Sequence, residues 1–125
     1  MSETSEKKET PEKKDAEPQA TRLMMFFPPM RLRIEGKISV KAMTDEDIID
    51  TTRDDLVELS INPECQTHFK NGEKTVKLQL TKGEADVEIS TGDRVETAVF
   101  RATWISGKSQ LQSLMVVMPV GGVVI

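Results

Sequence analysis

Cys65 and His68 are the residues whose chemistry can be named most directly from the sequence. They stand three positions apart in the stretch CQTH, a spacing at which a thiolate and an imidazole can hold one side of a zinc or copper ion. A closed zinc site needs about four ligands, and the chain has one Cys and one His. We therefore expect no metal site and no cofactor.

The same two side chains could act as a nucleophile and its base. Cys–His catalysis needs a lowered thiol pKa and an imidazole within hydrogen-bond reach, which residues so close in sequence rarely provide. The sequence singles out no Asn or Asp that would orient the imidazole, and no glycine-rich loop that could form an oxyanion hole lies nearby. One His and no Tyr in the whole chain leave little for acid–base chemistry. We expect no catalytic residues and no enzymatic activity.

An acidic stretch runs from Asp45 to Glu58, with Arg53 as its only base. A calcium loop needs ligands at alternate positions and a glycine in the middle, and this stretch has no glycine. Thr44 followed by acids is typical of a helix start, because the hydroxyl can accept an orphan backbone N–H and acids suit the positive end of the helix dipole. We expect a short acidic helix over about 45–57 with a solvated face, and a docking surface for a basic partner stays open as an alternative.

Alternation of apolar and polar residues over 32–42 predicts a strand with one solvated face, with a bulge or bend at Gly36. The cations of this face are Arg31, Arg33, Lys37 and Lys41. A single-strand nucleic-acid binder would interleave stacking aromatics with such cations, and this face has none. We expect the cations to pair with acids, such as those of 45–58, in the same chain or the next.

Residues 109–125 carry no charge, although 30% of the chain is Asp, Glu, Lys or Arg. Burying each aliphatic side chain is worth about 1.5–3 kcal/mol, so this segment is expected in a core or against another chain. Its apolar run 114–118 suits a central strand, or an edge strand covered by a neighbouring subunit. A second apolar segment, 23–30, contains paired prolines that favour an extended anchor. The predicted interaction residues are Phe26, Phe27, Pro28, Pro29, Met30, Met115, Met118, Val123, Val124 and Ile125.

Turn signals at 71–72, 82–83, 91–93 and 106–108 separate further runs of period-two alternation. This is the pattern of antiparallel strands with one wet face. We expect an α+β, mainly β fold: a small antiparallel β meander, sandwich or barrel with one short acidic helix and an extended N-terminal arm. The predicted organisation is a charged flexible arm at 1–22, an apolar Pro-containing anchor at 23–30, and a single β-rich domain at 31–125 that includes the helix at about 45–57.

Charge and composition narrow the partners and the compartment. A net charge of −4 gives no global field that would draw the chain to a phosphate backbone. The single cysteine fits a reducing compartment, and no secretory signal or membrane-spanning apolar run is visible. We expect a protein that is cytoplasmic or lies within a virion or similar particle, and that is not exported by a classical signal peptide.

These patterns favour a non-enzymatic structural or assembly protein, such as a virion or phage component. It would pack against neighbouring subunits, as a homo-oligomer or larger assembly, through its N-terminal arm and uncharged C-terminal segment. Two alternatives stay open. One is a small β-barrel that binds nucleic acid through the 31–41 face, and the other is an acidic adaptor or inhibitor.

Overall fold

The computed structural model describes residues 19–121. The predicted arm at 1–22 falls almost wholly outside that range, as do Val123, Val124 and Ile125. Within it, the elements follow one another along the chain as β2 (Arg22–Phe26), β3 (Glu35–Met43), β4 (Leu56–Ile61), β5 (His68–Phe69), the 3-10 turn η1 (Lys70–Gly72), β6 (Thr75–Gln79), β7 (Glu84–Ser90), β8 (Glu96–Ser106) and β9 (Leu114–Val120).

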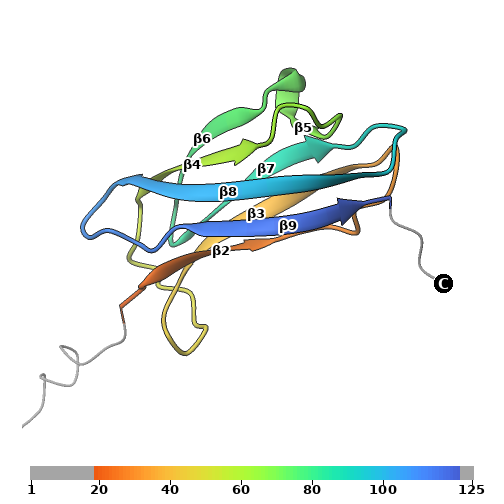
Figure 1. Cartoon of the computed structure of the whole chain (residues 1–125). Coiled ribbons are helices and arrows are strands. Elements are labelled where there is room, and N and C mark those ends of the chain that lie inside the picture. Colours follow the sequence, from red (N-terminus) through yellow and green to blue (C-terminus); the bar gives the residue numbers. More distant parts are fainter. Residues whose placement is uncertain (1–18, 122–125) are drawn as a thin grey trace, which may run out of the picture.

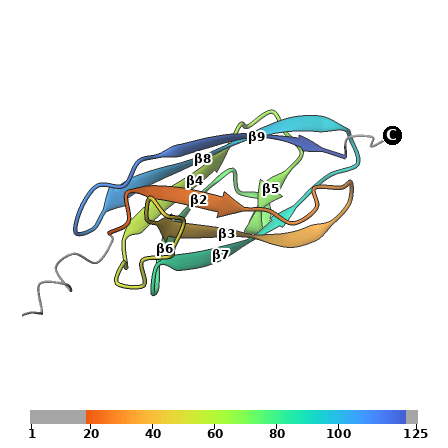
Figure 2. The same ribbon diagram turned by 90° about the horizontal axis from the view of Figure 1, so that it is seen from below.

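The strands form two four-stranded sheets, ordered β2-β3-β7-β5 and β6-β4-β8-β9. Every strand pair is antiparallel, and the sheets lie face to face as a sandwich (Figures 1 and 2). Apart from the β2–β3 and β8–β9 connections, each link passes from one sheet to the other. The expectation of a mainly β fold is confirmed, and the sandwich is the form it takes.

The core follows the alternation seen in the sequence. Each strand turns every second side chain inward. In β8 these are Ala98, Phe100 and Ala102, which are fully buried. The Phe100 ring meets the edge of Phe27 at 4.9 Å and that of Phe69 at 6.4 Å between centroids, so the layer between the sheets is filled by aromatic and aliphatic groups from both.

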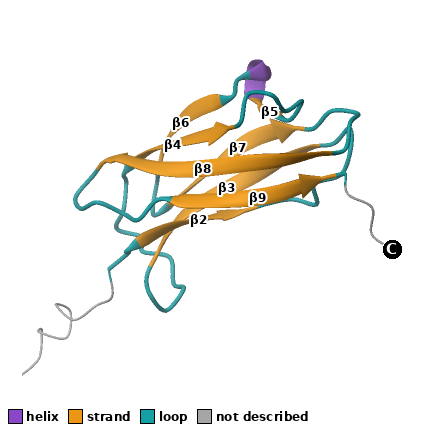
Figure 3. Ribbon diagram, in the orientation of Figure 1, coloured by secondary structure: helices purple, strands orange, loops and turns teal. Residues whose placement is uncertain are grey.

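The helix predicted over 45–57 is wrong, and among the described residues the only helical element is the turn η1 (Figure 3). Thr44 does cap the backbone, because its hydroxyl accepts the N–H groups of Glu46 and Ile48 at 3.2 Å each. The chain then turns away at Asp47, which has a positive φ of 64°. A cap and favourable acids are a weak local preference. Here the backbone of the segment is bonded elsewhere, from Asp50 N to Ala42 O (3.0 Å) and from Gly83 N to Arg53 O (2.8 Å).

The strand predicted from residue 32 begins only at Glu35, because Arg33 adopts a left-handed φ of 55°. No bulge or bend interrupts the ladder at Gly36, since the register with β7 runs unbroken from Glu35 to Lys41. The glycine has a different reason. A Cβ at Gly36 would lie 2.9 Å from Cγ of Pro28, so the missing side chain lets the proline pack on the strand.

The two apolar segments meet within one chain. The first half of 23–30 is strand β2, paired with β3, so it belongs to the sandwich and is not a separate anchor. The C-terminal run is the edge strand β9, bonded to β8 and not central. Main-chain hydrogen bonds join the segments at both ends, from Leu23 N to Gln112 O (3.1 Å) and from Gly121 N to Met30 O (2.7 Å).

Candidate functional site

Cys65 and His68 each have hydrogen-bonding partners other than one another. Cys65 is 7% exposed, and its thiol lies 3.2 Å from Oδ1 of Asn62 and 3.4 Å from the Thr97 carbonyl oxygen. Burial raises the pKa of this thiol, which keeps it protonated and unreactive. The His68 Nδ1 lies 2.9 Å from the Gln66 carbonyl oxygen. Within 19–121, no group of three or more His, Cys, Asp or Glu side chains is arranged to hold a metal.

Glu96 fastens the loop that carries the cysteine to the start of β8. Its carboxylate accepts the N–H groups of Gln66 and Thr67 at 2.9 Å each and the Thr67 hydroxyl at 2.7 Å. Burial alone would raise the pKa of Glu96, but these hydrogen bonds, with a further one from Arg94, outweigh it and lower the pKa to about 2. The sequence gives no sign of this contact, because its partners stand about thirty residues apart.

A second polar cluster closes the opposite end of the sandwich. The Arg53 guanidinium donates to both carboxylate oxygens of Asp55, at 2.9 and 2.8 Å, and both side chains are fully buried. Trp104 Nε1 donates to the same carboxylate at 2.7 Å, and Ser109 accepts from Arg53. Hydrogen bonding from Arg53 is the main cause of the lowered pKa of Asp55. Asp50, a further acid of this stretch, is also buried, so an acidic docking surface over this stretch would lack both carboxylates.

Two of the four cations predicted on one strand face, Lys37 and Lys41, lie beside acids of β7. Lys37 stands opposite Glu88 in the register of β3 and β7, and Lys41 forms an ion pair with Glu84 at 3.4 Å. Arg31 and Arg33 are exposed in the turn before β3. The acids therefore come from β7 and not from 45–58, and they alternate with the lysines across the outer face of the sheet.

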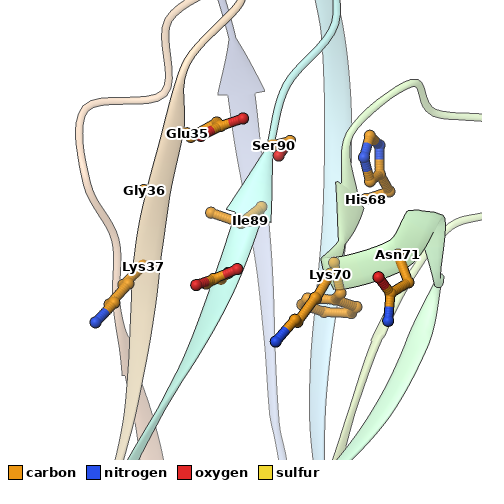
Figure 4. A pocket seen from close by; sticks show the side chains of 10 residues that line it. Glu35, Gly36, Lys37, His68, Lys70, Asn71, Ile89 and Ser90 are labelled. Atoms are coloured by element: carbon orange, nitrogen blue, oxygen red, sulfur yellow. The ribbon is translucent and has the colours of Figure 1, made fainter.

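A depression of about 490 Å³ lies on this same face, over β3, β5, η1 and β7 (Figure 4). Glu35, Lys37 and Lys70 line it from three different elements. Their charged ends do not converge on one point (Figure 4), and Phe69, the one Phe, Trp or Tyr in its wall, is fully buried. The depression is a shallow, charge-balanced stretch of sheet surface.

The outer face of β9 is different, because it is apolar. Met115 and Val117 are 54% and 58% exposed, Pro119 is exposed as well, and Val117 lies opposite the half-buried Val99 of β8. We call these four residues the β9 strip: Val99, Met115, Val117 and Pro119. The sequence-based prediction included Met115 but missed Val117, although period-two alternation along β9 carried the signal.

The other predicted interaction residues are spread between surface and core. Met118 is half-buried and packs against the core, and Met30 is buried. Phe27 packs on Phe100, whereas Phe26 is 44% exposed with the Lys41 ammonium 5.1 Å from its ring centroid. Pro28 lies against Gly36, and the adjoining Pro29 is exposed.

Comparison with known proteins finds a fold but no family. No family model matches the chain, and no curated protein matches it. Among solved structures, a glycosyl hydrolase family 2 member from Bacteroides cellulosilyticus matches 82% of this chain and 14% of its own, with a TM-score of 0.64 and 11% identity. The β-glucuronidase of Parabacteroides merdae matches 92% of this chain and 14% of its own, with a TM-score of 0.60 and 10% identity.

A third solved structure, described as a glycosyl hydrolase family 2 member from Bacteroides cellulosilyticus DSM 14838, has a TM-score of 0.63 and 11% identity. It is matched over 80% of this chain and 15% of its own. At these identities the likeness shows the β-sandwich fold alone, and the chain spans about one seventh of the length of these enzymes. In the part of the chain that is described, no helix is long and apolar enough to cross a membrane.

Proposed function

We propose that this chain is a non-enzymatic structural or assembly module that packs against a neighbouring polypeptide through the β9 strip. The observation that carries the proposal is the exposure of Met115 and Val117, each by more than half, side by side on the surface of an ordered strand. Single exposed apolar residues are common on soluble proteins, but contiguous apolar patches mark interaction sites.

The surroundings of the strip suit a protein partner. Thr97, Arg101 and Thr103 of β8 are exposed on the same face and give the apolar strip a polar border, which is the usual anatomy of an interface. On the opposite sheet, the outer face mixes lysines with the acids of β7. That mixture weakens the case for nucleic acid at 31–41, since phosphate binding needs clustered cations.

The solved structures add the fold of this chain and no evidence of its role. In them a fold of this kind makes up about 14–15% of a much longer chain, as expected for a unit that lies beside others. They are described as glycosyl hydrolases and a β-glucuronidase, and at 10–11% identity those activities are not carried over to this chain.

The proposal is tested by the native size of the chain. Size-exclusion chromatography of an unfractionated extract from the native source should show the protein eluting well above its own 14.0 kDa. Replacing Met115 and Val117 by lysine should return it to the monomer position. Thr103→Lys, an exposed position on the same face of β8, should leave the larger species intact. Elution of the unmodified chain as a monomer in the extract, or an assembly unaffected by the β9 lysines, would overturn the proposal.

A further inference from the structure

Strand β9 has an outer edge with which no strand of 19–121 pairs. It lies at the border of its sheet and is bonded to β8 alone. Figures 1 and 2 show β9 and β2 as the border strands of the two sheets on the same side of the sandwich. An uncovered strand edge presents a row of backbone donors and acceptors to any strand that can align with it.

The direction of those backbone groups follows from Val99. Its N–H donates to Asn62 Oδ1 (2.7 Å) and its carbonyl accepts from Asn62 N (3.3 Å), so both point toward β4 and away from β9. Val117 stands opposite Val99 and is therefore in a pair without mutual hydrogen bonds. By alternation, the backbone groups of Met115, Val117 and Pro119 lie in the plane of the sheet and point away from β8, toward the free edge. Pro119 fits such a position because β8 needs no N–H from it.

The other edge strands, β2, β5 and β6, are less suited to pairing with a further strand. β5 has two residues. Within β2 the outward N–H of Leu23 already donates to Gln112, whereas on the β9 side the N–H that is bonded in this way belongs to Gly121, one residue past the end of the strand. β6 carries the exposed Lys77 at its centre, the kind of charge that discourages edge pairing. β9 has seven residues and no charge. Among the described strands it is the edge best suited to accept another.

The edge is also complementary to itself. In an antiparallel pairing of two copies about a two-fold axis, Met115 would stand opposite Val117 of the second copy. Both outward donors, the N–H groups of Met115 and Val117, would then find carbonyl acceptors, and Pro119 would lie at the flank where its missing donor costs little. No like charges would be brought together. The sequence of 1–18 is by contrast rich in Lys and Glu, a poor match for an uncharged edge.

We infer that the partner of β9 is a second copy of this chain, joined edge to edge so that the two β6-β4-β8-β9 sheets become one continuous sheet. This inference rests on the proposed function and names its partner. It differs from it in one respect that can be measured: the purified chain alone must associate.

Sedimentation equilibrium of the purified full chain should show a monomer–dimer equilibrium. Val117→Pro removes the outward N–H without removing a bond to β8, and it should weaken the association constant at least about tenfold. Thr103→Lys, on the same face but away from the edge, should leave the constant unchanged. Circular dichroism and a thermal melt check that each variant is folded, and Val117→Lys, at a 58% exposed position, serves as a second edge variant.

The outcomes separate the two claims. A purified chain that stays monomeric at all concentrations, while the native extract shows the large species, would overturn the second-copy inference and leave the proposed function standing with a different partner. A dimer that folded Val117→Pro and Val117→Lys leave unchanged would overturn pairing through β9. A dimer lost with both edge variants and kept with Thr103→Lys supports it.

Discussion

Glu96 ties the Cys65 loop to the start of β8 through a buried, ionised carboxylate. Only 8% of its side chain is exposed, and it holds the N–H groups of Gln66 and Thr67. Because its pKa is about 2 in the folded chain against an ordinary 4.5, the ionised carboxylate stabilises the fold above about pH 4.5. That contribution is lost as the pH falls toward about 2.

Glu96→Gln should therefore lower the free energy of unfolding by about 2–3 kcal/mol at pH 7. The difference between the two proteins should shrink steadily below pH 4.5 and fall to about a quarter of its pH 7 value at pH 2.5. Urea unfolding of both proteins at pH 7 and pH 2.5 checks this. An equal difference at both values would show that the ionised form of Glu96 has no special role.

The buried pair of Arg53 and Asp55 makes a second prediction at this scale. Asp55→Asn keeps the shape of the side chain but leaves the buried guanidinium without its counter-charge, which should cost about 3–5 kcal/mol. Asp54→Asn is the matched control, because that neighbouring carboxylate is exposed and its loss should change stability by less than about 0.5 kcal/mol. Equal effects in thermal or urea unfolding would contradict the burial of the pair.

At the scale of elements, the strands could be predicted and the acidic segment could not. Alternation over 76–80, 85–89 and 98–104 identifies strands and their buried faces correctly, because each strand has one wet face and one dry face. The cap at Thr44 is also present, yet the segment after it is a loop. Local signals show where the chain can turn, but the backbone of the acidic segment is bonded to Gly83, about thirty residues further on, as well as to the nearby Ala42. Contacts at that distance leave no local pattern in the sequence.

The same limit applies to the candidate site. The absence of charge in the C-terminal segment predicts that β9 lies in a core or against another chain. The period-two alternation along β9 determines which of its side chains lie on the outer face of the sheet. The sequence-based prediction placed Met115 and Met118 in one group, whereas the ladder with β8 puts them on opposite faces.

Met118→Lys and Met115→Lys therefore form a matched pair within one strand. The charge at Met118 faces the core and should lower the free energy of unfolding by about 2–3 kcal/mol. The charge at Met115, which is 54% exposed, should change it by less than about 0.5 kcal/mol in the monomer. Urea unfolding at low protein concentration measures both, and a reversed order would place β9 in the wrong register.

At the scale of the whole molecule, the two apolar segments are joined just outside β9, by main-chain hydrogen bonds from Leu23 to Gln112 before the strand and from Gly121 to Met30 after it. Most of the uncharged C-terminal segment therefore forms an edge strand whose inner side chains pack against the core. The part that stays on the surface is the outer row of β9, and the proposed function rests on that row.

The most direct test of packing through the β9 strip is the oxidation of Met115 by hydrogen peroxide, read by mass spectrometry. In dilute purified chain Met115 should oxidise readily because it is exposed, while the buried Met25 and Met30 should resist as internal references. In the native assembly Met115 should become as resistant as those references, since the proposed partner covers it. Equal oxidation of Met115 in the dilute chain and in the native extract would contradict packing through this strip.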